Sequence, residues 1–334
     1  MANNHDQFLS FDDAIRLTST RMKALKISRK ALRDRIRKHF KENLDKEIKP
    51  KFWSQGSMTT NTIINPIPRE AEENGETYKI YKYDVDDGIY FIGDKDDRKD
   101  VGSYHSWIVA AVDGHTDTPA QDKDTCVRTI YHDGHNIDQP MYFEEKNIQC
   151  PQLAHKKKGW IDSDPREFTE WFNKKAAGNS QLVRMVRYLK AWCDYQNFLE
   201  GKEKMPIGLV MCIWAVQYAQ SNERDDVAMK DTLVNLTLAA DYQMKLSCLR
   251  PTVPSGEDLL DTYQYGEFFR NKLKEFRDSA VQAINETNAK VACGKWQLHF
   301  GDRFSCSNVQ DDKQANVFSA PAIVTSNAKS ATCK

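Results

Sequence analysis

The 334-residue sequence has no excess of charge of either sign, with 48 Lys and Arg against 48 Asp and Glu. A protein that binds nucleic acid over much of its surface carries a basic excess, so any such contact here must come from a local patch. No apolar run reaches the roughly 18–20 residues that a membrane-spanning helix needs. The nearest candidate, residues 206–219, is more typical of a helix buried inside a domain.

Secretion and zinc-binding signals are also missing. The first residues, MANNHDQFLSFDD, lack the basic segment and apolar stretch of a secretory signal. The eight cysteines are scattered without the CxxC spacing of a zinc ribbon, so we expect reduced thiols in a soluble, cytoplasmic protein. Hydrophobic residues make up 40% of the chain and aromatic residues 10%, which suffices for a large core and excludes a disordered chain.

Residues 10–48 are predicted to form a long leading helix, because apolar residues recur every four positions along it. Ser10 and Asp13 fit a capping box at its start. The other faces of this helix are basic between residues 21 and 41. A solvated helix face is the simpler interpretation of that charge, although it leaves a nucleic-acid contact open.

The rest of the chain changes from strands to helices. Short β-strands separated by Asn-Gly and Asp-Gly turns are predicted at residues 79–92, 107–112, 127–131 and 135–143. Amphipathic or buried helices follow at about residues 165–178, 180–201, 206–220, 225–247 and 266–288. The fold class is therefore α+β, a mixed sheet with helices followed by a helical part.

The strongest local signal is a pair of aspartates, Asp84 and Asp86, inside a predicted strand. Because side chains alternate along a strand, both carboxylates project from the same face. A divalent cation relieves their repulsion, and oxygen ligands from few protein groups suit Mg²⁺. Alone, this pattern is weak, because it also occurs on solvated edge strands.

Two further features favour a metal site. In Gln55-Gly56-Ser57, a Gly-Ser pair that opens a short helix allows backbone N–H groups to approach a phosphate. Asp138 lies in another predicted strand, where an unpaired acid would be costly if buried. A third carboxylate from an adjacent strand would complete a two-metal site for phosphoryl transfer.

These motifs resemble a known family. FWSQGS, DVDDGIYF and NIDQPMY, in this order, resemble the polymerase-β-like pattern of the cGAS/DncV-like nucleotidyltransferases. WIDSDPREFTEWFN, VRYLKAWCDYQ and WQLHFGDRF resemble the helical half of the DncV-type cyclic dinucleotide synthases, so the resemblance covers about residues 50–305. It implies a nucleotidyltransferase that joins nucleoside triphosphates into a cyclic second messenger in bacterial anti-phage (CBASS) defence.

The resemblance also implies a division of the chain. N-terminal spine helices would occupy residues 1–50, the nucleotidyltransferase core 51–160, a helical C-terminal domain 161–306 and a flexible tail 307–334. The active site would lie in the cleft between the core and the helical domain. We expect a monomer. The tail would be accessible for covalent conjugation by accessory proteins of the same operon, although a plain disordered tail is the simpler interpretation.

Site residues follow from the resemblance position by position. Asp84 and Asp86 would hold two Mg²⁺ ions, with Mn²⁺ as an alternative, and Asp138 would ligate one of them and favour deprotonation of the ribose hydroxyl. The substrates would be ATP and GTP. The expected nucleotide contacts, from the Gly-Ser motif and three later segments, are Gln55, Gly56, Ser57, Arg128, Ser163 and Lys190.

Two positions depart from the family pattern: Thr60 replaces an aromatic residue, and Pro206 stands where a serine is expected. Both changes concern base recognition, to which the loop 250–258 could contribute. Cyclic GMP-AMP is the favoured product, with a cyclic trinucleotide as an alternative. A template-independent RNA or tRNA nucleotidyltransferase, which shares the three aspartates, and a catalytically inactive nucleotide sensor are the competing hypotheses.

Overall fold

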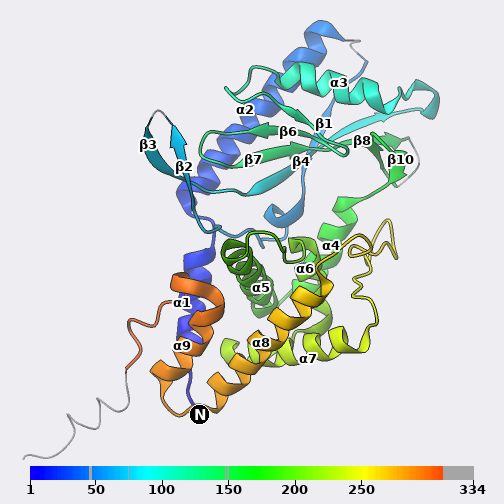
Figure 1. Ribbon diagram of the computed structural model, residues 1–334. Helices are drawn as coiled ribbons and strands as arrows, with labels where there is room; N and C mark the ends of the chain where they lie inside the picture. Colours follow the sequence, from blue (N-terminus) through cyan, green and yellow to red (C-terminus); the bar gives the residue numbers. More distant parts are fainter. Residues whose placement is uncertain (45–46, 74, 147, 149, 311–334) are drawn as a thin grey trace, which may run out of the picture.

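The computed structural model describes residues 1–44, 47–73, 75–146, 148 and 150–310 (Figure 1). A mixed β-sheet with α2 and α3 forms what we call the sheet half. Helices α1 and α4–α9 form the helical half, which lies below the sheet in Figure 1. Each half has its own buried hydrophobic core.

The N-terminal region forms two helices, α1 (His5–Ile15) and α2 (Ser19–Asn43), so the prediction of one continuous helix is wrong. Thr18, in extended conformation, begins α2 by accepting a hydrogen bond from the Arg21 N–H. Ser10 therefore lies inside α1 and caps nothing. The break sends α1 into the core of the helical half and α2 onto the sheet.

Strand β4 (Asp84–Gly93) lies at the centre of the sheet, whose order is β10-β9-β8-β4-β7-β6-β5. Strand β1 (Lys51–Ser54) pairs with it antiparallel. The other strands of this sheet are β5 (Gln121–Asp122), β6 (Val127–Ile130), β7 (Asn136–Gln139), β8 (Met141–Glu145), β9 (Gln152–His155) and β10 (Gly159–Asp162). A separate hairpin joins β2 (Arg69–Glu73) and β3 (Glu76–Ile80).

Strands β7 and β8 together form one parallel partner of β4, interrupted at Pro140. Pro140 has no N–H to donate, but its carbonyl accepts the Ile89 N–H at 2.9 Å, which keeps the two segments against β4. The resulting register pairs Asp84 with Asn136 and Asp86 with Asp138. The predicted strand region 79–92 thus splits into β3 and β4, while the predicted strands at 127–131 and 135–143 are confirmed.

Helix α3 (Val101–Val112) contradicts the strand predicted at residues 107–112. Its buried residues recur at helical rather than alternating spacing: Tyr104, His105, Ile108, Ala111 and Val112. Asp100 begins the helix by accepting the Ser103 N–H at 2.9 Å. The helix packs with α2 on the face of the sheet that is turned away from the helical half (Figure 1).

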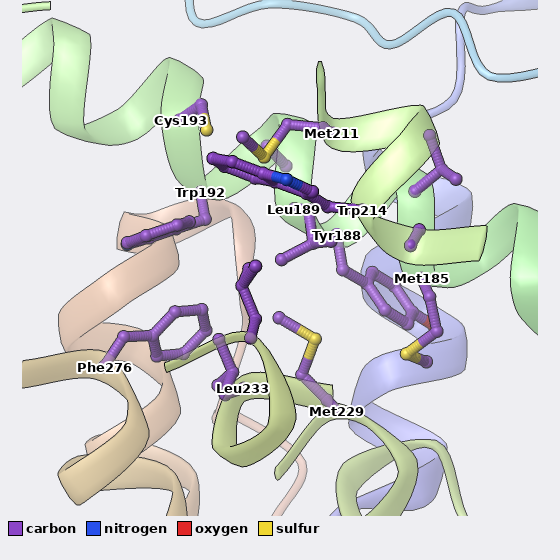
Figure 2. Close-up of a cluster of buried hydrophobic side chains, with 14 of the residues drawn as sticks. Met185, Tyr188, Leu189, Trp192, Cys193, Met211, Trp214, Met229, Leu233 and Phe276 are labelled. Carbon is purple, nitrogen blue, oxygen red and sulfur yellow. The ribbon is translucent and has the colours of Figure 1, made fainter. Parts of the chain in front are cut away.

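The expected helices of the helical half are confirmed, with ends a few residues earlier than predicted. They are α4 (Pro165–Ala176), α5 (Ser180–Leu199), α6 (Gly208–Tyr218), α7 (Asp225–Tyr242) and α8 (Gly266–Asn285), followed by α9 (Ala289–Phe300), which the sequence did not predict. Figure 2 shows their core, in which Trp192, Trp214 and Phe276 are almost fully buried. Within the described residues, no helix is long and apolar enough to cross a bilayer.

One pair of cysteines departs from the expectation of reduced thiols. Cys293 of α9 and Cys306 form a disulfide. The short 3₁₀ helix η3 (Gly301–Arg303) turns the chain back, which brings their Cα atoms to 5.8 Å, within the usual range for a disulfide. The other cysteines of the described part of the chain are free: Cys126, Cys150, Cys193, Cys212 and Cys248.

Candidate functional site

Three predicted aspartates meet where β4 and β7 run side by side. Asp86 lies opposite Asp138, and Asp84 lies two residues earlier on β4. Paired residues on neighbouring strands project from the same face, so the three carboxylates share the face of the sheet that is turned to the helical half. The strand alternation read from the sequence is therefore sufficient to place Asp84 and Asp86, whereas Asp138 depends on the register of β7.

Arg128 of β6 lies between these carboxylates. Its Nε and Nη2 donate to the two oxygens of Asp138 at 2.6 and 2.7 Å, and Nη2 also donates to Asp84 Oδ2 at 2.8 Å. Asn136 holds the other oxygen of Asp84 at 2.8 Å, a contact that the sequence motifs did not indicate. These hydrogen bonds, above all those to Asp138, raise the pKa of Arg128. The guanidinium thus supplies positive charge where a cation would bind.

The electrostatics of Asp86 fit a cation site. Burial and the neighbouring carboxylates of Asp138 and Asp84 raise the pKa of Asp86 to about 6. Three carboxylates are a donor set of hard oxygens that suits a divalent cation. Across the described ranges, no three metal-binding side chains are already gathered around one point, so the site needs rearrangement around Arg128 before a cation is held.

Gly56 is required where the Gly-Ser turn crosses Asp86. Its φ of +66° is a conformation that side-chain-bearing residues rarely adopt. A Cβ at this position would lie 2.5 Å from Asp86 Oδ2. The Gln55 N–H donates to the Asp86 carbonyl at 3.0 Å, and the short 3₁₀ helix η1 (Gly56–Met58) follows, as the sequence predicted.

Gln55 has a different environment from the one expected. Its side chain is buried, with 3% exposed, and turns toward the sheet. There Nε2 donates to the Tyr90 hydroxyl at 2.8 Å, while Oε1 accepts from the Tyr142 hydroxyl at 3.4 Å. Gln55 therefore holds the Gly56–Ser57 turn against the sheet, because its side-chain amide is bonded to Tyr90 and Tyr142. The sequence signal for this role is Gly88, whose missing side chain leaves room for the Gln55 amide.

A cavity of about 430 Å³ lies above Asp86 and Asp138, between the sheet half and the helical half. It is lined by predicted residues from both halves, namely Gln55, Gly56, Ser57, Asp86, Asp138, Ser163 and Lys190. Arg250, in the loop 250–258, lines it as well. Sequence reasoning did not single out the lining residues Cys126, Tyr142, Phe168 and Gly208, although Tyr142 and Phe168 lie within quoted motifs. Asp84 and Arg128 are not among its lining residues, and Arg128 connects Asp84 to the lining residue Asp138 by bonding both.

Lys190 of α5 reaches toward the Gly-Ser turn. Its Nζ donates to the Thr62 carbonyl at 3.1 Å and to the Thr62 hydroxyl at 3.2 Å. A Cβ at residue 208 would lie 2.9 Å from Lys190 Cε, so Gly208 leaves space for the lysine stem. Lys190 also favours the ionised form of Asp86, which places its charge on the same site.

The basic face of α2 is partly used inside the protein. Arg33 Nε donates to the buried Asp87 at 2.7 Å, and Arg35 Nε to the Ala111 carbonyl at 2.9 Å. Arg21 lies 3.3 Å above the ring centre of Tyr81. These arginines hold α2 on the sheet half. The structure thus offers less free charge for nucleic acid than the sequence suggested.

Part of the chain matches a known domain family, and most of it is similar to characterised proteins. Residues 50–142 match the family described as the nucleotidyltransferase domain of DncV-like cyclic GMP-AMP synthases. A cyclic GMP-AMP synthase of Escherichia albertii is 25% identical over 279 residues, or 80% of this chain. Residues 50–142 thus form a DncV-like nucleotidyltransferase domain.

A Vibrio cholerae cyclic GMP-AMP synthase is also similar to this chain, at 25% identity over 78% of the chain and 69% of that protein. The match to the Escherichia albertii protein spans only 57% of that protein's length. In fold, the chain resembles the crystal structure of Vibrio cholerae DncV with a TM-score of 0.73 at 20% identity, covering 91% of this chain and 98% of that one. The GTP-bound form of the Vibrio protein also has a TM-score of 0.73.

Proposed function

We propose that this nucleotidyltransferase is a cyclic oligonucleotide synthase that joins two nucleoside triphosphates, ATP and GTP by preference, into cyclic GMP-AMP. One observation carries the proposal: paired Asp86 and Asp138 line the same cavity as the Gly56–Ser57 turn and Lys190. The names of the relatives support it. Vibrio cholerae DncV, whose fold is shared, has been crystallised with 3′-deoxy ATP, with GTP and with a linear pppApG intermediate.

The reaction would be two successive phosphoryl transfers. A ribose hydroxyl of one nucleotide loses its proton and attacks the α-phosphorus of the other, and the bond from that phosphorus to pyrophosphate breaks. A second attack of the same kind, after the linear product has turned round, closes the ring. Two divalent cations, Mg²⁺ by preference, would be held by Asp84, Asp86 and Asp138 and would neutralise the charge that develops at the α-phosphate.

The protein's own groups would bind and orient the substrates. Lys190 would leave Thr62 and donate to the triphosphate, while the backbone of the Gly56–Ser57 turn lies against the phosphates. Arg128, whose guanidinium bonds Asp84 and Asp138, would exchange these bonds for a nucleotide contact if the aspartates held cations. Ser163 and Arg250, which also line the cavity, would contact the second nucleotide.

A signalling role in anti-phage defence, and conjugation through the C-terminal tail, are further parts of the proposal that depend on the family resemblance. Residues 311–334, which make up most of that tail, lie outside the described residues. Infection of cells that carry the gene with its neighbours, compared with the Asp84→Asn variant, tests the defence role. Mass spectrometry of the C-terminal peptide from the same cells tests the conjugation.

The deciding experiment is incubation with four labelled nucleoside triphosphates and Mg²⁺, then phosphatase, chromatography and mass spectrometry. We expect a phosphatase-resistant product whose mass identifies the bases. Asp84→Asn should abolish it with the fold intact, because the Asp84 side chain is half exposed and only charge is removed. Extension of an added RNA without a cyclic product would favour the RNA nucleotidyltransferase. Triphosphate binding without any turnover would favour an inactive sensor.

A further inference from the structure

Charged side chains of α5 bond the segment of residues 61–67, which follows the Gly56–Ser57 turn. Three of its side chains, at helical spacings of three and four residues, bond the backbone of residues 61–67. Along the helix, these bonds join Arg187 Nη1 to the Asn61 carbonyl at 2.7 Å, Lys190 Nζ to the Thr62 carbonyl at 3.1 Å, and Asp194 Oδ2 to the Ile67 N–H at 2.9 Å. This side of α5 is thus an internal contact between the two halves.

Arg187 is the most rigidly held of these side chains. Only 3% of it is exposed, and its Nε and Nη2 donate to the two oxygens of Asp12, on α1, at 2.6 and 2.9 Å. Asp12 is 1% exposed. Because this two-pronged ion pair fixes the guanidinium plane, the direction of Nη1 toward the Asn61 carbonyl is fixed as well.

Asn61 lies in a loop that closes on the catalytic turn. Of the described non-glycine residues, it is the one with a positive φ, at +55°. The Ser57 carbonyl accepts the N–H groups of Thr62 and Ile63 at 2.9 and 3.1 Å, so residues 57–63 form a closed loop. A displacement of the Asn61 carbonyl is therefore transmitted to Ser57.

We propose that Arg187 is a positioning residue that holds the loop 57–63, and with it Ser57, in place over the aspartates. In the structure, Lys190 shares this task through Thr62. Under the proposed function, on which this inference rests, Lys190 gives up that contact when it binds a triphosphate. Arg187 then remains as the charged anchor of the loop during the reaction.

Arg184, one turn earlier on α5, provides a matched control. It forms the same two-pronged ion pair with a buried aspartate, Asp225, at 2.6 and 2.8 Å. Its third group bonds Ser180, within α5, instead of the loop. Arg187→Lys and Arg184→Lys each remove one guanidinium fork and keep the charge, and they differ in whether the catalytic loop loses a bond.

Kinetics and thermal unfolding of the two variants test the proposal. We expect similar losses of thermal stability, but an increase in KM for the donor triphosphate on the order of tenfold only in Arg187→Lys, with kcat within about threefold of wild type. Arg184→Lys should leave both constants within about twofold. Equal changes in both variants, or an unchanged KM in Arg187→Lys, would show that Arg187 is merely structural.

Hydrogen exchange tests the loop without turnover. The N–H groups of Thr62 and Ile63 should exchange on the order of tenfold faster in Arg187→Lys than in wild type or Arg184→Lys. Unchanged exchange would overturn the proposal. If the wild-type chain makes no product, the proposed function fails, while this measurement still decides whether Arg187 holds the loop.

A second pair of variants leaves the ion pairs untouched, in case Arg187→Lys does not fold. The Asn61 side chain is exposed, so its replacement acts mainly through the backbone. Asn61→Val penalises the positive φ and should reproduce the higher KM and the faster exchange. Asn61→Gly tolerates that conformation and should behave as wild type. Wild-type behaviour of Asn61→Val would contradict the transmission through the loop.

Discussion

Asp86 is stabilised in its protonated form by the fold itself. Its pKa rises from its ordinary 3.8 to about 6 because of burial and the nearby carboxylates of Asp138 and Asp84. The folded protein therefore binds this proton more tightly than the unfolded chain, and without a cation it loses stability as the pH rises from about 4 to about 6. Since one pKa unit corresponds to about 1.4 kcal/mol, the loss amounts to roughly 1–3 kcal/mol.

Asp86→Asn removes that cost. In EDTA at pH 7.5 the variant should be about 1–3 kcal/mol more stable than wild type in denaturant unfolding, and the difference should shrink toward zero near pH 4. A gain in stability that does not change with pH would contradict a raised pKa of Asp86 as its cause. With Mg²⁺ the order should reverse, because only wild type gains stability from cation binding.

Gly56→Ala should lower activity because its side chain would contact Asp86, and not only because the backbone conformation becomes strained. The new Cβ would lie 2.5 Å from Asp86 Oδ2, so the turn or the carboxylate must move. Gly159→Ala is the matched control, because Gly159 also has a positive φ, +75°, but its Cβ would meet no atom within 4 Å. We expect both to lose about 1 kcal/mol of stability, and only Gly56→Ala to lose on the order of 100-fold in kcat/KM. Equal activity losses would contradict this.

At the scale of elements, side chains alternate along β4, so a residue of the proposed site and a residue that stabilises the fold are neighbours in the sequence but lie on opposite faces of the sheet. Asp86 faces the cavity, while the next residue, Asp87, is fully buried on the other face and paired with Arg33 of α2. Asp87→Asn should cost about 3 kcal/mol, because it breaks a buried ion pair, yet leave kcat within about threefold at a temperature where the variant is folded. Abolished turnover in a folded Asp87→Asn would assign it to the site instead.

Local pattern explains which elements could be predicted. The sequence places Asp84 and Asp86 on one face and places α4–α8 correctly, because alternation and helical spacing are short-range signals. The strand prediction for residues 107–112 was wrong because their β-branched and aromatic content favours a strand. The signals for a helix are Asp100, which caps it, and the spacing of four residues between Ile108 and Val112. Contacts between distant segments, such as Arg128 with Asp84, depend on strand register and on tertiary packing, which no single motif encodes.

At the scale of the whole molecule, the start and end of the described chain meet in one aromatic cluster. Phe8 of α1 is fully buried against Tyr188 of α5, at 5.1 Å between ring centres, and against Trp296, Phe300 and Phe304 near the C-terminal end. Together with the Asp12–Arg187 pair, the cluster fixes α1 in the helical half while α2 remains on the sheet half.

Phe8→Ala should therefore destabilise the protein by about 4 kcal/mol in denaturant unfolding, since it leaves a large cavity. Tyr242→Ala is the control, because Tyr242 is 88% exposed, and its loss should stay within about 0.5 kcal/mol. A small effect of Phe8→Ala would show that α1 contributes little to holding the helical half together.

The fit of Gln55 against Gly88 restricts how this site can evolve. A Cβ at residue 88 would overlap the Gln55 amide, which is itself bonded to the Tyr90 hydroxyl. A larger residue at position 88 would therefore displace the Gln55 amide from its bond with Tyr90, so the order of mutations matters: Gly88 is replaced more easily once Gln55 has been shortened. A lineage that shortens Gln55 first passes through an intermediate with a void beneath the Gly56–Ser57 turn. The stability lost at that stage restricts which residues can replace Gln55.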